Sequence, residues 1–106
     1  LNIFNKMDCL ISPSLSEGAG TSVMEAMMSG IYVIAYKNSG HNYILKNTNN
    51  YLCKQNNYNE IMEGVEFFLN MNQKQIYKNK VLSYNKIKKN YTTELIVKNL
   101  KSILQK

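Results

Sequence analysis

Two glutamates separated by seven residues flank a glycine-rich stretch that leads into an apolar segment. Small residues at 18–20 let the backbone approach a ligand, and the free amides of a following helix start suit a phosphate. A carboxylate before the helix can accept hydrogen bonds from sugar hydroxyls, and one inside it can accept two from a ribose diol. A diphosphate between two diols is the outline of a sugar nucleotide. The candidate ligand-binding residues are therefore Glu17, Gly18, Ala19, Gly20, Thr21, Ser22 and Glu25.

The same residues also fit a purely structural interpretation. Ser22 and Glu25 have the spacing of a capping box, in which the serine caps a helix and the glutamate reaches back to its amide. Thr21 is an alternative cap. Glu17 would then be a loop carboxylate in the positive field of a helix start, and the glycines would only supply turn conformations. Physical chemistry alone leaves both interpretations open.

The spacing of apolar residues predicts the elements that must position this stretch. Strands and helices alternate, which predicts a parallel sheet with helices packed on it, and ligands then bind in loops beyond the carboxyl ends of the strands. We expect strands at 8–14, 31–36 and 49–54. We expect the end of a helix at 4–7 and further helices at 21–30, 58–70, 73–89 and 93–105, with Gly30 as the C-cap of the helix at 21–30. Residues 15–20 and 37–42 are expected loops, and 43–47 at most one helical turn. The helical spacing groups Ile61, Met62, Val65, Phe68 and Leu69 on one face, and Tyr77, Val81, Tyr84 and Ile87 on another.

The positive charge is concentrated in the last third of the chain. Residues 1–69 carry four lysines and six acidic residues, net −2, whereas residues 70–106 carry nine lysines and one glutamate, net +8. All of these cations are lysines, although base readout and bidentate phosphate binding usually depend on arginine. A solvated helix surface is therefore the first interpretation, an anionic membrane or acidic partner the second, and nucleic acid the last.

Other residue types limit the remaining functions. Cys9 and Cys53 lie in apolar runs and are expected to be reduced core residues. His41 is the only histidine, so no metal site is expected; it and Lys37 are expected to lie in a solvated loop. No apolar run approaches the ~20 residues that a membrane-spanning helix needs. The chain begins at Leu1, and we expect it to be a piece of a longer protein.

Taken together, these motifs resemble a known family. The sequence DCLISPSLSEGAGTSVMEAMMSGIYVIAY, with its E-x7-E spacing, is similar to the strand, loop, helix and strand of retaining group 1 glycosyltransferases with the GT-B fold. NSGHNYI and YTTELIVKNLKSIL resemble the family's next loop and terminal helix. The resemblance implies that residues 1–106 are the second half of a C-terminal Rossmann-like donor-binding domain, without its upstream strands and N-terminal domain. Tyr32 replaces the family's proline, and the family's loop glutamate near His41 has no counterpart.

The resemblance also implies roles for the candidate residues. Glu17 would hold hydroxyls of the transferred sugar as the catalytic residue, residues 18–20 would approach the sugar and its phosphate, and Glu25 would bind the ribose. The amides of Thr21 and Ser22 would face the diphosphate. The implied reaction transfers a sugar, with retention, from a UDP-, GDP- or ADP-sugar to a glycan or lipid acceptor, without a metal or cofactor.

The family resemblance further implies a cytoplasmic enzyme of surface polysaccharide or glycolipid synthesis. The basic helices expected within 73–106 would suit peripheral contact with the inner face of an anionic membrane. We expect no nucleic acid partner, and we expect this segment alone to be inactive, because half of the cleft lies outside it. The alternative is a non-catalytic α/β interaction module whose basic C-terminal helices bind an anionic membrane or partner.

Overall fold

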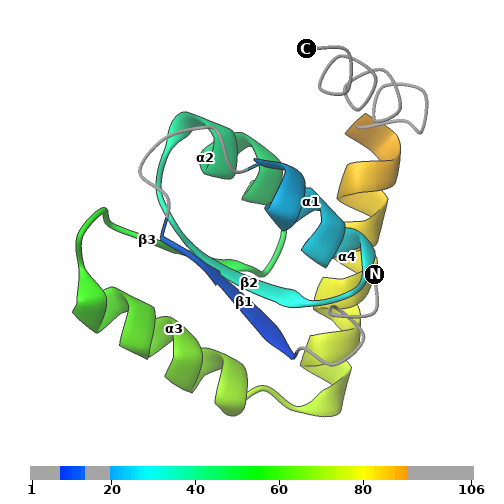
Figure 1. Ribbon diagram of the computed structural model, residues 1–106. Coiled ribbons are helices and arrows are strands. Elements are labelled where there is room, and N and C mark those ends of the chain that lie inside the picture. Colours follow the sequence, from blue (N-terminus) through cyan, green and yellow to red (C-terminus); the bar gives the residue numbers. More distant parts are fainter. Residues whose placement is uncertain (1–7, 14–19, 91–106) are drawn as a thin grey trace.

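The structure is a computed structural model that describes residues 8–13 and 20–90 (Figure 1). The expected helix segments at 4–7 and 93–105, and all but the last residue of the expected loop at 15–20, lie outside the described residues. The elements are β1 (Cys9–Ser12), α1 (Gly20–Met28), β2 (Tyr32–Tyr36), α2 (Ser39–Leu45), β3 (Tyr51–Cys53), α3 (Tyr58–Leu69) and α4 (Gln73–Asn90).

The three strands form a parallel sheet in the order β1-β2-β3, as the alternation of strands and helices predicts. Leu10 is paired with Val33, and Ile34 with Tyr51. Every residue of the central strand β2 is buried, which explains why its sequence is a continuous apolar run and not an alternating one.

Helices cover both faces of the sheet. Val33 and Ala35 of β2 pack in a core with α1, α2 and α4, whereas the alternate residues Tyr32, Ile34 and Tyr36 pack against α3. The Tyr32 ring stacks on that of Phe68, with centroids 5.2 Å apart. Figure 1 shows α3 on the opposite side of the sheet from α1 and α2. This layered arrangement confirms the predicted α/β fold.

The turn between α1 and β2 confirms the predicted glycine cap. Gly30 has a φ of +76°, a conformation that costs most other residues energy. Its amide donates to the carbonyl of Met27, and the amide of Ile31 donates to that of Ala26 at 2.9 Å. These two bonds are a Schellman motif, which closes the helix and turns the chain directly into the central strand.

The prediction for residues 37–47 was wrong, because α2 is a helix of seven residues that begins inside the expected loop. The side chain of Asn38 caps it by accepting a hydrogen bond from the amide of His41 at 2.7 Å. His41, Ile44 and Leu45 then face the core at helical spacing. The cap supplies the helix start that apolar periodicity alone did not reveal.

Helix α4 also presents a different face to the core from the one suggested by its apolar spacing. Ile87 is fully buried, but Tyr77 and Tyr84 are 69% and 44% exposed. The inward positions before Ile87 are the buried polar residues Asn79 and Ser83.

These polar residues are anchored by the side chain of Asn50, just before β3. Its amide nitrogen donates to the Ser83 hydroxyl at 3.0 Å, and its oxygen accepts from the Asn79 amide and from the backbone amide of Val33. A hydrogen-bonded network therefore fixes α4 where apolar contacts were expected.

On the other face of the sheet, α3 packs as predicted only in part. Ile61, Val65 and Phe68 contact the core, but Met62 and Leu69 are 59% and 71% exposed. The helix approaches the sheet so closely that a Cβ atom added at Gly64 would lie 2.9 Å from a ring carbon of Tyr51. Gly64 thus sets the distance between α3 and the sheet.

Candidate functional site

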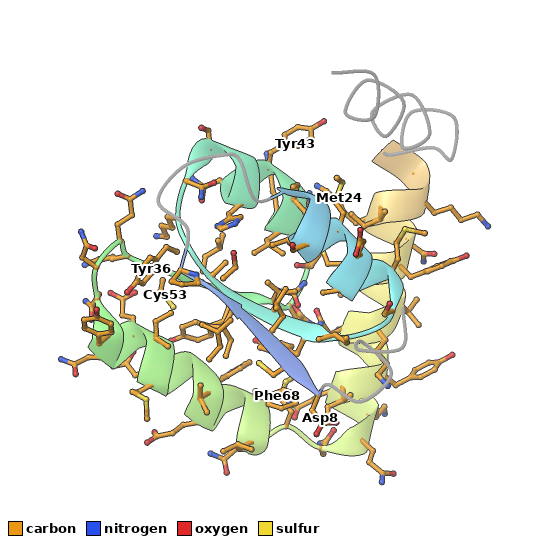
Figure 2. The ribbon with its side chains drawn as sticks, viewed as in Figure 1. Asp8, Met24, Tyr36, Tyr43, Cys53 and Phe68 are labelled. Carbon is orange, nitrogen blue, oxygen red and sulfur yellow. The ribbon has the colours of Figure 1, made fainter. Side chains whose placement is uncertain are left out.

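The carboxyl ends of the three strands lie at one edge of the sheet, because the strands are parallel. Figure 2 shows Tyr36 and Cys53, the last residues of β2 and β3, close together at one end of the sheet, with Asp8 at the other end. The amide of Lys37 donates to the Cys53 carbonyl at 2.7 Å, and the Gln55 side chain donates to the Lys37 carbonyl at 2.8 Å. Backbone and side-chain hydrogen bonds therefore hold this edge in place.

The side chain of His41 contacts the ends of both β1 and β2. Its Nδ1 lies 2.6 Å from the carbonyl oxygen of Tyr36, and its Nε2 lies 3.3 Å from the hydroxyl of Ser12 at the end of β1. A carbonyl can only accept, so the network places a proton on Nδ1, and in the neutral ring Nε2 accepts from Ser12. The Asn38 side-chain nitrogen, 3.1 Å from Nδ1, then contacts the ring without donating to that atom.

The expectation that His41 lies on a loop surface is therefore wrong. Only 1% of the residue is exposed, and it belongs to α2. Its ring is a positioning group that fixes the end of β1, from which the chain runs on toward Glu17, relative to the end of β2. The pattern Asn38-x-x-His41, an N-cap residue before a buried helical position, was the signal in the sequence that could have identified it.

The start of α1 lies at the same edge, because this helix connects the end of β1 to the parallel strand β2. The first amides of an α-helix have no partner within the helix, and its N-terminus carries a partial positive charge. Gly20 is the first helical residue, and the first turn contains no acidic side chain that would neutralise this field. The described residues therefore place a helix start, with no acidic side chain in its first turn, at the carboxyl edge of a parallel sheet.

Glu25 and Ser22 lie on the exposed side of α1, whereas Val23, Ala26 and Met27 are buried. The capping-box interpretation is wrong, because α1 already begins at Gly20, so that Ser22 and Thr21 lie within the helix. Glu25 follows Gly20 by five residues, about 7.5 Å along the helix axis. A ligand held at the helix start would therefore have to extend along the helix to reach Glu25.

The structure places only some of the candidate residues. Gly20, Thr21, Ser22 and Glu25 share the first turns of α1. The remaining candidates, Glu17, Gly18 and Ala19, lie outside the described residues. Lys37, the cation that follows β2, is exposed, in agreement with its expected solvation.

Neither cysteine is in a disulfide, as expected. Cys53 is fully buried and Cys9 partly so. Burial raises the pKa of each thiol to about 11, so both stay protonated near neutral pH. They are packing residues and not nucleophiles.

In the part of the chain that the structure describes, no group of three histidine, cysteine, aspartate or glutamate residues could hold a metal ion. None of the helices in residues 8–13 and 20–90 is both long and apolar enough to cross a membrane.

A parallel sheet with helices on both faces and a helix start at its carboxyl edge defines a Rossmann-like α/β domain. The sequence profile of the family described as glycosyl transferases group 1 matches residues 1–90. The chain therefore belongs to this family.

A solved structure supports the same assignment. The protein is similar to the C-terminal domain of a glycosyl transferase group 1 family protein (LpcC) from Francisella tularensis, with a TM-score of 0.72 and 26% identity. The match covers 86% of this chain and 47% of that one, so the chain spans about half the length of its solved relative. The fold thus matches part of the C-terminal Rossmann-like domain of a GT-B glycosyltransferase. No curated protein that was compared with the chain matches it.

Proposed function

We propose that this protein is part of a retaining glycosyltransferase that transfers a sugar from a nucleoside-diphosphate sugar, and that this chain supplies one wall of the donor site. The observation that carries the proposal is the start of α1 at the carboxyl edge of the sheet, with the exposed Glu25 farther along the same helix. A single nucleoside-diphosphate ligand fits both features, because its anionic diphosphate suits the helix start and its ribose diol suits the carboxylate.

Each candidate residue binds a different part of the donor in this proposal. The amides of Thr21 and Ser22 bind the diphosphate, and the Glu25 carboxylate accepts hydrogen bonds from the ribose hydroxyls. Glu17 holds hydroxyls of the transferred sugar and is the catalytic residue, while the backbone of Gly18, Ala19 and Gly20 approaches the sugar and its phosphate.

The chemistry follows from this placement. As the bond between the anomeric carbon and the phosphate breaks, negative charge develops on the departing diphosphate. The amides and the positive end of α1 face that charge and stabilise it in the transition state. The acceptor oxygen forms the new bond to the anomeric carbon with retention, and its hydroxyl proton passes to the departing diphosphate. This design requires no metal ion, because backbone donors face the departing diphosphate.

The chain also fits a position within a longer protein. We propose that it is the second half of the donor-binding domain, since it spans about half of the solved C-terminal domain that it resembles. The acceptor, a glycan or a lipid of surface polysaccharide or glycolipid synthesis, would then bind largely outside this chain, and the chain alone would not catalyse transfer. A cytoplasmic location with peripheral contact to an anionic membrane is part of this proposal.

Calorimetric titration of the purified full-length protein with UDP-, GDP- and ADP-sugars tests the donor site. At least one of these donors should bind, and Glu25→Ala should weaken its binding by about ten- to a hundredfold, the effect of losing hydrogen bonds worth ~1.5–3 kcal/mol to a charged acceptor. Glu66→Ala is the matched control, because Glu66 is an exposed glutamate on α3, across the sheet, and this variant should bind like the parent.

Absence of binding for all three donors, or equal binding by the parent and Glu25→Ala, would contradict the proposal that the protein is a glycosyltransferase. If such a protein still bound anionic vesicles, the non-catalytic interaction module would be the better assignment.

A further inference from the structure

Helix α4 carries a continuous exposed strip of lysines and apolar or aromatic residues. The helix contains six lysines and no acidic residue in its 18 positions. Six exposed residues on one side of the helix form what we call the lysine–tyrosine face, and each lies three or four positions from another member: Lys74, Tyr77, Lys78, Val81, Tyr84 and Lys88.

This face points away from the rest of the protein. The opposite side of α4 holds the buried Asn79, Ser83 and Ile87, so the helix is already anchored without it. Tyr77 is 69% exposed and Val81 39%. In Figure 1, α4 lies at the side of the molecule and extends beyond the sheet. None of the apolar residues of this face belongs to either hydrophobic core cluster.

Not every lysine of α4 belongs to the face. Lys86 turns toward α2, where its Nζ donates to the Lys46 carbonyl at 3.1 Å and lies 5.4 Å from the centre of the Tyr43 ring. The carbon chain of Lys80 covers Gly30. Lys88, by contrast, stays on the outer face with its Nζ 5.9 Å from the centre of the Tyr84 ring. Cation and aromatic ring are thus interleaved on the surface itself.

The opposite side of the sheet carries the opposite charge. Helix α3 contains three glutamates, Glu60, Glu63 and Glu66, and no lysine. Because α3 and α4 pack on different faces of the sheet, the described residues place an acidic helix on one face and a basic helix on the other. A negatively charged surface would attract the α4 side and repel the α3 side, so this asymmetry orients the molecule.

We propose that the lysine–tyrosine face docks on an anionic lipid bilayer. Lysines near such a surface each contribute about 1 kcal/mol, and tyrosines favour the boundary between headgroups and acyl chains. The alternation of both residue types on one strip suits a bilayer better than a nucleic acid, since no arginine is available for bidentate phosphate or base contacts. This inference assigns residues to the membrane contact proposed above and does not depend on the donor site.

Co-sedimentation of the purified full-length protein with vesicles tests the electrostatic part. Binding to phosphatidylcholine vesicles containing phosphatidylserine should exceed binding to pure phosphatidylcholine vesicles and should weaken with added salt. Lys78→Gln with Lys88→Gln should lower the affinity about thirtyfold, the combined effect of two lysines at ~1 kcal/mol each. The matched control, Lys46→Gln with Lys54→Gln, removes the same charge from exposed positions outside α4 and should change the affinity less than threefold.

A second pair of variants tests the aromatic part. Tyr77→Ser should weaken vesicle binding severalfold, whereas Tyr58→Ser should not, although Tyr58, on α3, is also highly exposed at 80%. Circular dichroism verifies that all variants are folded.

Three results would overturn the proposal: equal losses from the two double-lysine variants, equal binding to both kinds of vesicle, or tighter binding to duplex DNA than to the anionic vesicles. Donor titration in the absence of vesicles is a separate measurement, so either proposal can fail without the other.

Discussion

Replacement of His41 by leucine should destabilise the protein strongly, although leucine is close to histidine in size. The ring fills a site that is 1% exposed and serves the Tyr36 carbonyl at 2.6 Å and the Ser12 hydroxyl at 3.3 Å. Leaving a buried polar group without a partner costs about 1–3 kcal/mol. The short bond to Tyr36 accounts for most of the loss and the long bond to Ser12 for less, so the free energy of unfolding should fall by about 2–4 kcal/mol.

Urea unfolding followed by circular dichroism measures this loss, and His41→Asn separates the two contacts. The asparagine amide can donate to the Tyr36 carbonyl but is too short to reach Ser12 as well, so more than half of the stability lost in His41→Leu should return. A His41→Leu protein within about 0.5 kcal/mol of the parent would refute the reasoning, since surface changes of no structural importance have effects of that size. So would a His41→Asn protein as unstable as His41→Leu.

Three further outcomes are expected. Asn50→Ala should lower the free energy of unfolding in urea by about 2–4 kcal/mol, because it leaves the Val33 amide and the α4 network without their shared partner; a loss below ~1 kcal/mol would contradict the network. Gly64→Ala should lower the melting temperature despite the better helix propensity of alanine, because the new Cβ would lie 2.9 Å from the Tyr51 ring; a rise would contradict this close approach. Burial raises the pKa of Cys53 to about 11 from 9.0, so the thiol ionises first in the unfolded protein, and the free energy of unfolding should fall between about pH 9 and 11. Alkylation of the Cys53 thiol at pH 9 should be slow until the protein unfolds. Fast alkylation of the folded protein would refute the burial of this thiol.

Much of the fold could be predicted from the sequence, because the sheet and two of its helices follow simple periodicities. Residues 31–36 are a continuous apolar run, and the strand found there, β2, is entirely buried. Gly30 marked the end of α1 because few other residues adopt its positive φ.

The failures occurred where polar groups, and not apolar ones, face the core. Apolar periodicity could not find the start of α2, which depends on the Asn38 cap and on the buried ring of His41. The same reasoning chose the wrong face of α4, because Asn79 and Ser83 are buried only through their long-range bonds to Asn50. Such pairings join residues about 30 positions apart and leave no local pattern in the sequence.

Only part of the geometry of the candidate site is described by the structure. The spacing of Glu17 and Glu25 suggested a donor site; α1 starts at the expected edge of the sheet, and Glu25 is exposed farther along this helix. The competing capping box failed because the helix begins two residues before Ser22. The donor-binding roles of Glu17 and Glu25 both stay predictions.

The most direct test of the central claim is a crystal structure of the full-length protein with the nucleoside diphosphate that calorimetry selects. The donor-site account predicts phosphate oxygens within hydrogen-bonding distance of the first-turn amides of α1, and ribose hydroxyls on the carboxylate of Glu25. A diphosphate bound away from the start of α1, or a ribose that leaves Glu25 without contact, would contradict it.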